Sequence, residues 1–225
     1  MKALAVDTAT PLASVAALEG GRLLGEAAVG AGRSHSEHLL QAVQFLLGRL
    51  GWSPEEIDLY VVTTGPGSFT GLRIGIGTVR GLAMAAGRPA AGVSTLRAMA
   101  TALGAASERL APILDAGRGE VYAGLYSGGD LPEPLREDAV VKPAGLPEFL
   151  GPGPVMAFGS GAERYAGLLR ERLGTGARIL PWRVPLAAGA GQLACRLVAS
   201  GHAVSDLPLS ARYIRRSDAR LPGGR

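Results

Sequence analysis

Residues 59–87 read LYVVTTGPGSFTGLRIGIGTVRGLAMAAG. The first six are apolar or hydroxyl-bearing, which is typical of a buried strand, and Gly65-Pro66 ends that strand. A helix is expected from about Gly71 to Gly87, because apolar residues recur there at three- and four-residue spacing. Several of its interior positions are glycine, and each interior glycine costs about 1 kcal/mol relative to alanine. Some close contact must offset this loss if the helix is to form.

The glycines of this helix fall into two rows. One row holds Gly67, Gly71 and Gly75, and the other holds Gly77 and Gly81. Four-residue spacing leaves bare backbone along one side of the helix in each row. Beside them runs an apolar stripe of Leu72, Ile76, Val79 and Ala83. The stripe can face the chain's own core, the helix expected at residues 35–50, or a second protein. We favour a second protein, and predict that residues 65–73 begin a docking element in which Ser68 and Thr70 cap the helix.

Outward from this segment, one order of elements occurs twice along the chain. Each half is expected to run through three strands, a helix, a strand, a helix, a strand and a helix. The first half has these elements at residues 2–8, 12–18, 22–29, 34–50, 59–64, 71–87, 91–93 and 94–104, with a short helix from Ser53. The second has them at residues 111–115, 120–126, 135–141, 146–150, 155–158, 162–173, 178–180 and 187–200. We therefore predict a duplicated α/β fold with a cleft between its copies, divided into residues 1–106 and 107–225.

The helix at residues 34–50 carries strong terminal signals. Ser34 and Glu37 form a capping box at its start, and Gly51 ends it. Its apolar side consists of Leu39, Leu40, Val43, Leu46, Leu47 and Leu50. This helix and the glycine-rich helix are the two elements that we expect to meet a partner.

Composition indicates a folded chain with a real core, because 47% of its residues are apolar. No apolar run approaches the roughly 18 residues that cross a bilayer, and the N-terminus opens on a strand pattern, so we expect a soluble, unexported, cytoplasmic protein without a membrane partner. The single cysteine, Cys195, is expected to be a small buried apolar side chain without thiol chemistry.

The net charge of +4 comes from one end of the chain. Residues 212–225 hold five arginines and one aspartate, so the rest of the chain is neutral overall. This segment is either a frayed terminus or an arm that contacts phosphates, and composition favours the terminus.

A duplicated plan of this kind resembles the superfamily of actin, sugar kinases and heat-shock chaperones, which has a ribonuclease H-like fold. In that superfamily the first strand of each half ends in an aspartate facing nucleotide phosphates, and Asp7-Thr8 and Asp115 stand in those places. Ala9 occupies a position where a kinase would carry glycine, which hinders backbone approach to phosphate. The other interpretation, which we favour, is that both aspartates cap tight turns. Gly159 and Gly161 stand where the superfamily binds adenosine, although a turn into a helix needs no ligand.

The remaining residues give little indication of metal or nucleotide chemistry. His35 and His38 are three residues apart, His202 is the only further histidine, and no cluster of side chains has metal-ligand spacing. The chain has no G-x-x-x-x-G-K-[ST] loop, and the glycines near residue 67 miss the dinucleotide spacing by one residue. We therefore expect no metal and no catalytic residue.

Several motifs resemble the bacterial TsaB family. They are residues 65–75, Asp7-Thr8, residues 33–37, Gly92-Val93-Ser94 and residues 115–122, and the likeness extends to Pro208 and to residues 213–215. Proteins of this family resemble the threonylcarbamoyl transferase TsaD in fold and pair with it. Together with the ATPase TsaE they support formation of N6-threonylcarbamoyladenosine beside the anticodon of tRNA.

The resemblance implies a non-catalytic partner of TsaD, because TsaD-type transferases bind a metal with two histidines four residues apart and this chain has no such pair. It implies docking on TsaD, or on a second copy when TsaD is absent, through the helices at residues 34–50 and 71–87. The residues expected to dock are Gly67, Phe69, Gly71, Leu72, Gly75, Ile76, Val79, Leu39 and Val43. Contact with tRNA is expected through the complex, and ATP with magnesium only at the level of the complex.

Two enzymatic alternatives remain at this stage. One is an ATPase or kinase that uses Asp7 and Asp115 in the cleft, which calorimetry with magnesium-ATP would detect. The other is a metallopeptidase, for which the sequence offers no ligand cluster.

Overall fold

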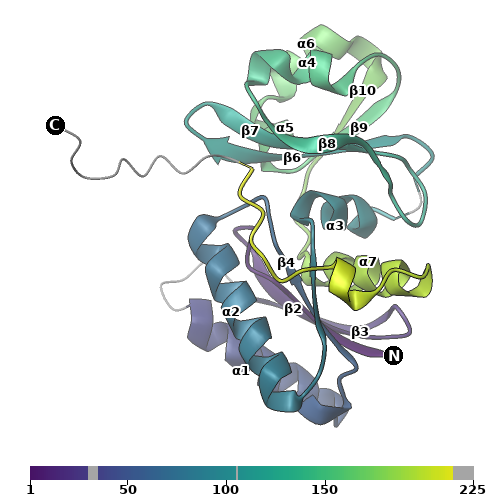
Figure 1. The fold of residues 1–225 in the computed structure, drawn as a ribbon. Coiled ribbons are helices and arrows are strands. Elements are labelled where there is room, and N and C mark those ends of the chain that lie inside the picture. The colour runs from purple at the N-terminus through teal and green to yellow at the C-terminus, as the bar shows by residue number, and fades with distance from the viewer. Residues whose placement is uncertain (30–34, 105, 215–225) are drawn as a thin grey trace, which may run out of the picture.

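The structure is a computed structural model that describes residues 1–29, 35–104 and 106–214. Two five-stranded sheets lie one above the other, each with helices on its faces (Figure 1). The predicted capping box of Ser34 and Glu37 lies outside the residues whose side chains are described.

The first sheet has the strand order β3-β2-β1-β4-β5. Its strands are β1 (Lys2–Asp7), β2 (Ala13–Glu19), β3 (Arg22–Val29), β4 (Leu59–Thr63) and β5 (Ala90–Val93). β1 pairs antiparallel with β2 and parallel with β4, so it lies at the centre of the sheet. This mixed pairing arises because β1–β3 form a meander, whereas β4 and β5 each return through a helix.

The second sheet repeats this plan in the order β8-β7-β6-β9-β10. Its strands are β6 (Arg109–Gly117), β7 (Glu120–Tyr126), β8 (Pro134–Val141), β9 (Val155–Phe158) and β10 (Ala177–Leu180). The central strand β6 pairs antiparallel with β7 and parallel with β9, as β1 does with β2 and β4. The predicted duplicated α/β fold is therefore confirmed.

Two helices cover the outer face of the first sheet: α1 (His35–Leu50) over β2 and β3, and α2 (Phe69–Ala86) over β4. Between them and the sheet lies an apolar core that includes Leu4, Val6, Val15, Leu39, Val43, Tyr60, Val62, Ile76 and Val79. α2 ends at Gly87, whose φ of 63° is the left-handed conformation that glycine adopts readily.

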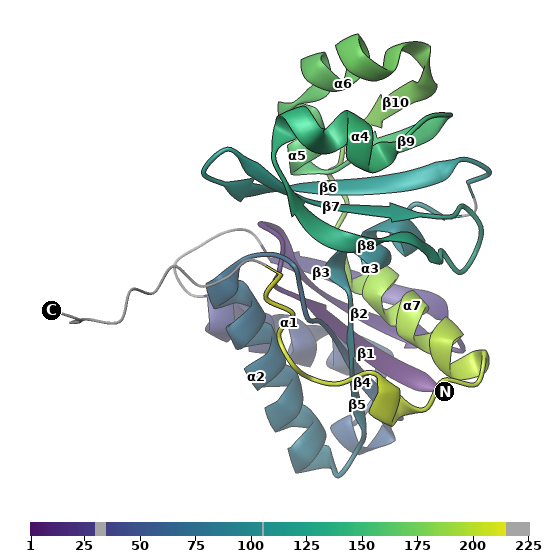
Figure 2. The ribbon, with the colours of Figure 1, turned by 45° about the horizontal axis from the view of Figure 1, so that its top comes forward.

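The layer between the two sheets contains one helix from each half. α3 (Thr95–Ala102) packs on β6 and β7 of the second sheet, whereas α7 (Ala187–Ala199) packs on β1, β2 and β4 of the first (Figure 2). The two helices also contact each other, and their side chains join both sheets into one core. The domain division at residue 106 stays a prediction. In the sequence, the strands of the first sheet all precede this residue and those of the second all follow it. Helix α7, however, follows residue 106 and packs on the first sheet.

The outer face of the second sheet carries α4 (Leu146–Leu150), α5 (Ser160–Arg164) and α6 (Ala166–Leu173). The prediction of one helix over residues 162–173 was wrong. The chain leaves the helical conformation at Tyr165, with φ −106° and ψ 23°, because α5 covers β6 whereas α6 turns toward β10 and α4. In the described part of the chain no helix is long and apolar enough to span a membrane.

The start of α7 is held by side chains from the first sheet. Ser14 Oγ accepts hydrogen bonds from the amides of Leu186 and Ala187, at 3.2 and 3.0 Å, and Glu26 Oε1 accepts one from Ala188 at 2.8 Å. Leu186 cannot cap a helix with its own side chain, so these distant oxygens satisfy the first amides. No local sequence signal reveals this cap.

The C-terminal segment after α7 follows the edge of the first sheet. Gly92 donates its amide hydrogen to the carbonyl of Leu207, and Arg212 donates its amide hydrogen to the carbonyl of Thr64, at 2.9 and 2.7 Å. A side chain at Gly92 would collide with the Pro208 carbonyl. The segment thereby covers a sheet edge whose backbone groups would otherwise be unpaired.

Replacement of Ser14 by alanine is expected to lower the free energy of unfolding by about 1 to 2 kcal/mol, because two buried amides of α7 lose their acceptor. Chemical denaturation measures this change. Ser205→Ala, at an exposed position, is the matched control and should leave the stability unchanged. Equal effects of the two substitutions would contradict the cap.

Candidate functional site

A cleft of about 1400 Å³ opens between the two halves of the molecule. Its walls come from the loop after β1, the start of α2, the loop after β6 and the C-terminal segment at residues 212–214. The duplicated fold predicts a nucleotide site in this cleft. Such a site would need carboxylates and backbone amides that face the cleft and are available to magnesium and phosphates.

Asp7 at the end of β1 does not face the cleft. It is fully buried, and its Oδ1 accepts hydrogen bonds from the Thr63 hydroxyl and the Ala9 amide, at 2.5 and 3.1 Å. Its Oδ2 accepts one from the Thr10 hydroxyl at 2.5 Å. Burial raises the pKa of Asp7, and these hydrogen bonds oppose the rise. Asp7 therefore closes a turn inside the protein instead of presenting a carboxylate to hydrated magnesium.

The first row of glycines in α2 presses on the loop after β1. A Cβ at Gly67 would lie 2.5 Å from the Ala9 carbonyl oxygen. At Gly71 and Gly75 it would collide with the Thr8 carbonyl and hydroxyl oxygens. The Thr8 hydroxyl donates a hydrogen bond to the Gly71 carbonyl at 2.7 Å. The helix thus packs against the carbonyl groups of the loop, and the Ala9 amide donates to Asp7, so this amide is not available to a phosphate.

This packing corrects the predicted docking residues. Leu39, Val43, Gly71, Leu72, Gly75, Ile76 and Val79 are all buried in the chain's own core or against its own loop. The apolar residues of this set expose at most 8% of their surface, so the structure places the set in packing within the chain and not on the surface that a partner would meet. Gly67 is half-buried, and Phe69, with 49% of its surface exposed, can still meet a partner. The intramolecular contact offsets the helix propensity that the first row loses.

The second row of glycines lies on the outer side of α2. Gly77 and Gly81 are exposed, and a Cβ at either position would meet no atom within 4 Å. Besides Phe69, three large apolar side chains on α1 and α2 are exposed: Leu40, Phe45 and Met84, at 44, 64 and 76%. We call Leu40, Phe45, Gly77, Gly81 and Met84 the helix-pair surface. α1 and α2 lie side by side on the outside of the first sheet (Figure 1).

Ser68 acts as predicted, as the cap of α2. Its hydroxyl oxygen accepts a hydrogen bond from the Gly71 amide at 3.2 Å. An oxygen engaged in this way completes the first turn of the helix, so the loop has a structural role at this position.

Asp115 faces the cleft, unlike Asp7. Its Oδ1 accepts a hydrogen bond from the Gly117 amide at 2.9 Å, and its Oδ2 forms an ion pair with Arg164 at 2.5 Å. The Gly117 amide and Arg164 hold the pKa of Asp115 below its ordinary value. The carboxylate therefore serves as a turn cap and ion-pair partner, the interpretation that the sequence favoured.

Gly159 and Gly161 are explained by packing. A Cβ at Gly159 would collide with the Ile113 carbonyl, and one at Gly161 would lie 2.8 Å from Ile113 Cγ2. Both glycines let α5 approach β6, and neither lines the cleft. Ser160 does line it, and its hydroxyl accepts a hydrogen bond from the Asp115 amide at 3.1 Å. The suggested contact of Gly159 and Gly161 with adenosine has no support in this geometry.

The other candidate side chains lie apart. His38 and His202 are exposed on separate elements, and the side chain of His35 lies outside the described residues. Cys195 is buried, as predicted, and burial raises the pKa of its thiol. Among residues 1–29, 35–104 and 106–214 no three histidine, cysteine or carboxylate side chains are grouped as a metal would need.

One polar cluster joins the two halves and was missed from the sequence. Asp138 of β8 accepts hydrogen bonds from the Tyr126 hydroxyl and, at 2.8 Å, from the Ser94 hydroxyl. Ser94 also caps α3 by accepting a hydrogen bond from the Arg97 amide. Burial raises the pKa values of Tyr126 and Asp138. Only the cap was visible in the sequence, because the partner strand lies 44 residues away.

Comparisons with known proteins agree with this architecture. The TsaD family, described as tRNA N6-adenosine threonylcarbamoyltransferase, matches residues 29–163. The Escherichia coli "tRNA threonylcarbamoyladenosine biosynthesis protein TsaB" is 33% identical, with 99% of each chain covered. A crystal structure from Pseudomonas aeruginosa, described as similar to peptidase YeaZ, has a TM-score of 0.80 and 31% identity over 95% of this chain and 99% of that one. A Thermus thermophilus ROK hexokinase, at 16% identity and a TM-score of 0.51 over 87% of this chain and 98% of that one, shares the fold alone.

The two glycine rows should respond oppositely to alanine. Gly71→Ala is expected to lower the free energy of unfolding by about 2 to 3 kcal/mol, because the new methyl group collides with the Thr8 backbone. Gly77→Ala, in open space on the same helix, should raise it by about 0.5 to 1 kcal/mol. Urea denaturation of both variants measures the difference. A stabilised Gly71→Ala protein would show that the row does not press on the loop.

Asp7 is expected to make stability depend on pH. Because its folded-state pKa is raised above 3.8, the folded state binds the proton more tightly, and the free energy of unfolding falls as pH rises from 3.8 through the raised value. Asp7→Asn should lack this contribution. The difference between the two denaturation curves across pH separates Asp7 from Asp138, whose pKa burial also raises, and includes the part of the raised pKa of Glu26 that the Asp7 charge causes. Parallel curves would contradict the assignment.

Proposed function

The chain belongs to the TsaB family and so takes part in forming threonylcarbamoyladenosine in tRNA, and we propose that it does so as the non-catalytic partner of a TsaD-like transferase. The observation that carries the non-catalytic role is the burial of Asp7 at the end of β1. Asp7 is buried in hydrogen bonds with Thr10, Thr63 and the Ala9 amide, so neither its carboxylate nor that amide is available to magnesium or phosphate, as an ATPase or kinase of this fold would need.

The helix-pair surface is the proposed contact with the transferase. It combines exposed apolar side chains with two glycines that let another helix approach closely, and such patches mark protein interfaces. The TsaD family matches residues 29–163, which include α1 and α2. A TsaD-like chain would therefore bring an equivalent helix pair, and the two pairs could meet about a pseudo-twofold axis.

The same surface accounts for the homodimer proposed when the transferase is absent. Two copies would present identical helix pairs to each other, as an isologous interface requires. A TsaE-like ATPase is proposed to join once the transferase is bound, and tRNA is proposed to bind the assembly. Cytoplasmic location is part of the same proposal, since tRNA modification of this kind takes place where tRNA is used.

Phe45→Asp is expected to lower the affinity for the TsaD-like transferase by at least about tenfold and so to reduce co-elution with it. The substitution places a charge at the aromatic position of the helix-pair surface. Leu135→Asp is the matched control, since Leu135 is 50% exposed on β8 of the second sheet. Size-exclusion chromatography of each variant with the transferase compares them. Unchanged co-elution of Phe45→Asp would refute docking through this surface.

Gly75→Leu is unsuitable as a test of docking. Gly75 contacts the Thr8 side chain inside the protein, so the substitution should disrupt the fold of the monomer. Gly81→Leu tests the same idea at an exposed position of the helix-pair surface.

A further inference from the structure

The mouth of the cleft carries an ordered group of aromatic and arginine side chains. The rings of Phe69 and Tyr213 lie 5.2 Å apart at an angle of 35°. The guanidinium of Arg73 lies 3.9 Å from the centre of the Phe69 ring, and its Nε donates a hydrogen bond to the Tyr213 hydroxyl at 3.4 Å. Both rings are 49% exposed. We call these three residues the mouth cluster.

The mouth cluster links two distant parts of the chain. Phe69 and Arg73 belong to the first turns of α2, whereas Tyr213 follows the segment that covers the edge of the first sheet. The Arg212 amide bonds to Thr64 at 2.7 Å, which fixes Tyr213 beside the helix. Two exposed rings are thus held in place before any ligand arrives, so binding would lose little side-chain entropy there.

The cleft beside the mouth cluster is basic. Its lining includes Arg73, Arg118 and Arg212, with Asp115 as its one acidic residue within the described part of the chain. Asp115 is already paired with Arg164. An anionic ligand would therefore be attracted to this side of the molecule.

We propose that the mouth cluster binds single-stranded RNA, with unpaired bases stacked on Phe69 and Tyr213 and phosphates held by Arg73, Arg118 and Arg212. Exposed aromatic faces beside arginines are the features with which proteins hold unpaired bases of RNA loops. The identification of this RNA as the anticodon loop of tRNA rests on the proposed function. An acidic segment of a protein would need the arginines but not the two ring faces.

Fluorescence anisotropy of the full chain with a labelled anticodon stem–loop RNA, at low salt, tests this. Phe69→Ala and Tyr213→Ala should each weaken binding by about tenfold or more, because stacking is worth about 1 to 3 kcal/mol per base. Tyr213→Phe keeps the ring and should keep most of the affinity. Arg73→Ala should reduce the slope of log affinity against log salt by about 0.7 for each phosphate that the arginine neutralises.

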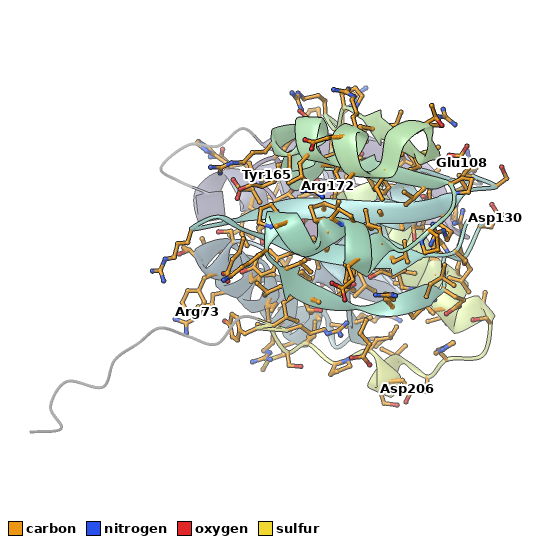
Figure 3. The ribbon with its side chains drawn as sticks, turned by 90° about the horizontal axis from the view of Figure 1, so that it is seen from above. Arg73, Glu108, Asp130, Tyr165, Arg172 and Asp206 are labelled. Carbon is orange, nitrogen blue, oxygen red and sulfur yellow. The ribbon has the colours of Figure 1, made fainter. Side chains whose placement is uncertain are left out.

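Arg172→Ala is the matched control. Arg172 is exposed on α6, away from Arg73 (Figure 3), and its removal should change neither affinity nor salt slope. Phe69 and Tyr213 are half-exposed, so thermal unfolding should show that their alanine variants remain folded.

Three outcomes would overturn the inference: no binding by the wild-type chain at low salt, equal reductions in affinity for Arg73→Ala and Arg172→Ala, or wild-type RNA affinity in the folded Phe69→Ala and Tyr213→Ala proteins. If those variants keep RNA affinity but no longer co-elute with the transferase, the mouth cluster is a protein contact. The docking role is tested separately through Phe45→Asp, so it can stand when the RNA inference fails.

Discussion

The contact between the first glycine row of α2 and the loop after β1 determines much of the structure around the cleft. Gly67, Gly71 and Gly75 let the helix reach the backbone of Thr8 and Ala9, and a methyl group at any of them would prevent this approach. The same contact fixes the rotation of α2 about its axis. Its apolar stripe then faces the first sheet, its second glycine row faces outward, and its first turn presents Phe69 and Arg73 at the mouth of the cleft.

The two halves are held together by exchange of elements rather than by a simple interface. α3 of the first half covers the second sheet, and α7 of the second half covers the first. Polar groups reinforce the exchange, because Ser14 and Glu26 satisfy the first amides of α7 and Ser94 bonds to Asp138. These hydrogen bonds connect residues that lie far apart in the chain and join the two halves of the molecule.

The order of strands and helices could be predicted because periodicity and turn residues are local properties. The direction in which each glycine row faces could not be predicted from the sequence. Gly71 and Gly77 are both glycines of one helix, and only the position of the β1 loop separates a packing role from an exposed one. The cap of α7 could not be predicted for the same reason, since Ser14 lies more than 170 residues before the helix in the sequence. At Asp7 and Asp115 the favoured turn-cap interpretation agreed with the structure, because a carboxylate followed by a turn needs only neighbouring amides.

The N-terminal part of α2 therefore contributes to the cleft in two places. At the floor of the cleft the helix packs on the loop after β1, and Asp7 is held in hydrogen bonds with Thr10 and Thr63. At the mouth, the first turn of the same helix supplies an aromatic ring and a guanidinium to solvent. Nothing about the floor requires the mouth to be aromatic and basic, since a helix start packed on a loop is satisfied by its cap at Ser68. The contacts of Phe69, Tyr213 and Arg73 with one another attach the C-terminal segment to α2, and the exposed half of each aromatic residue is left for a ligand that stacks on it.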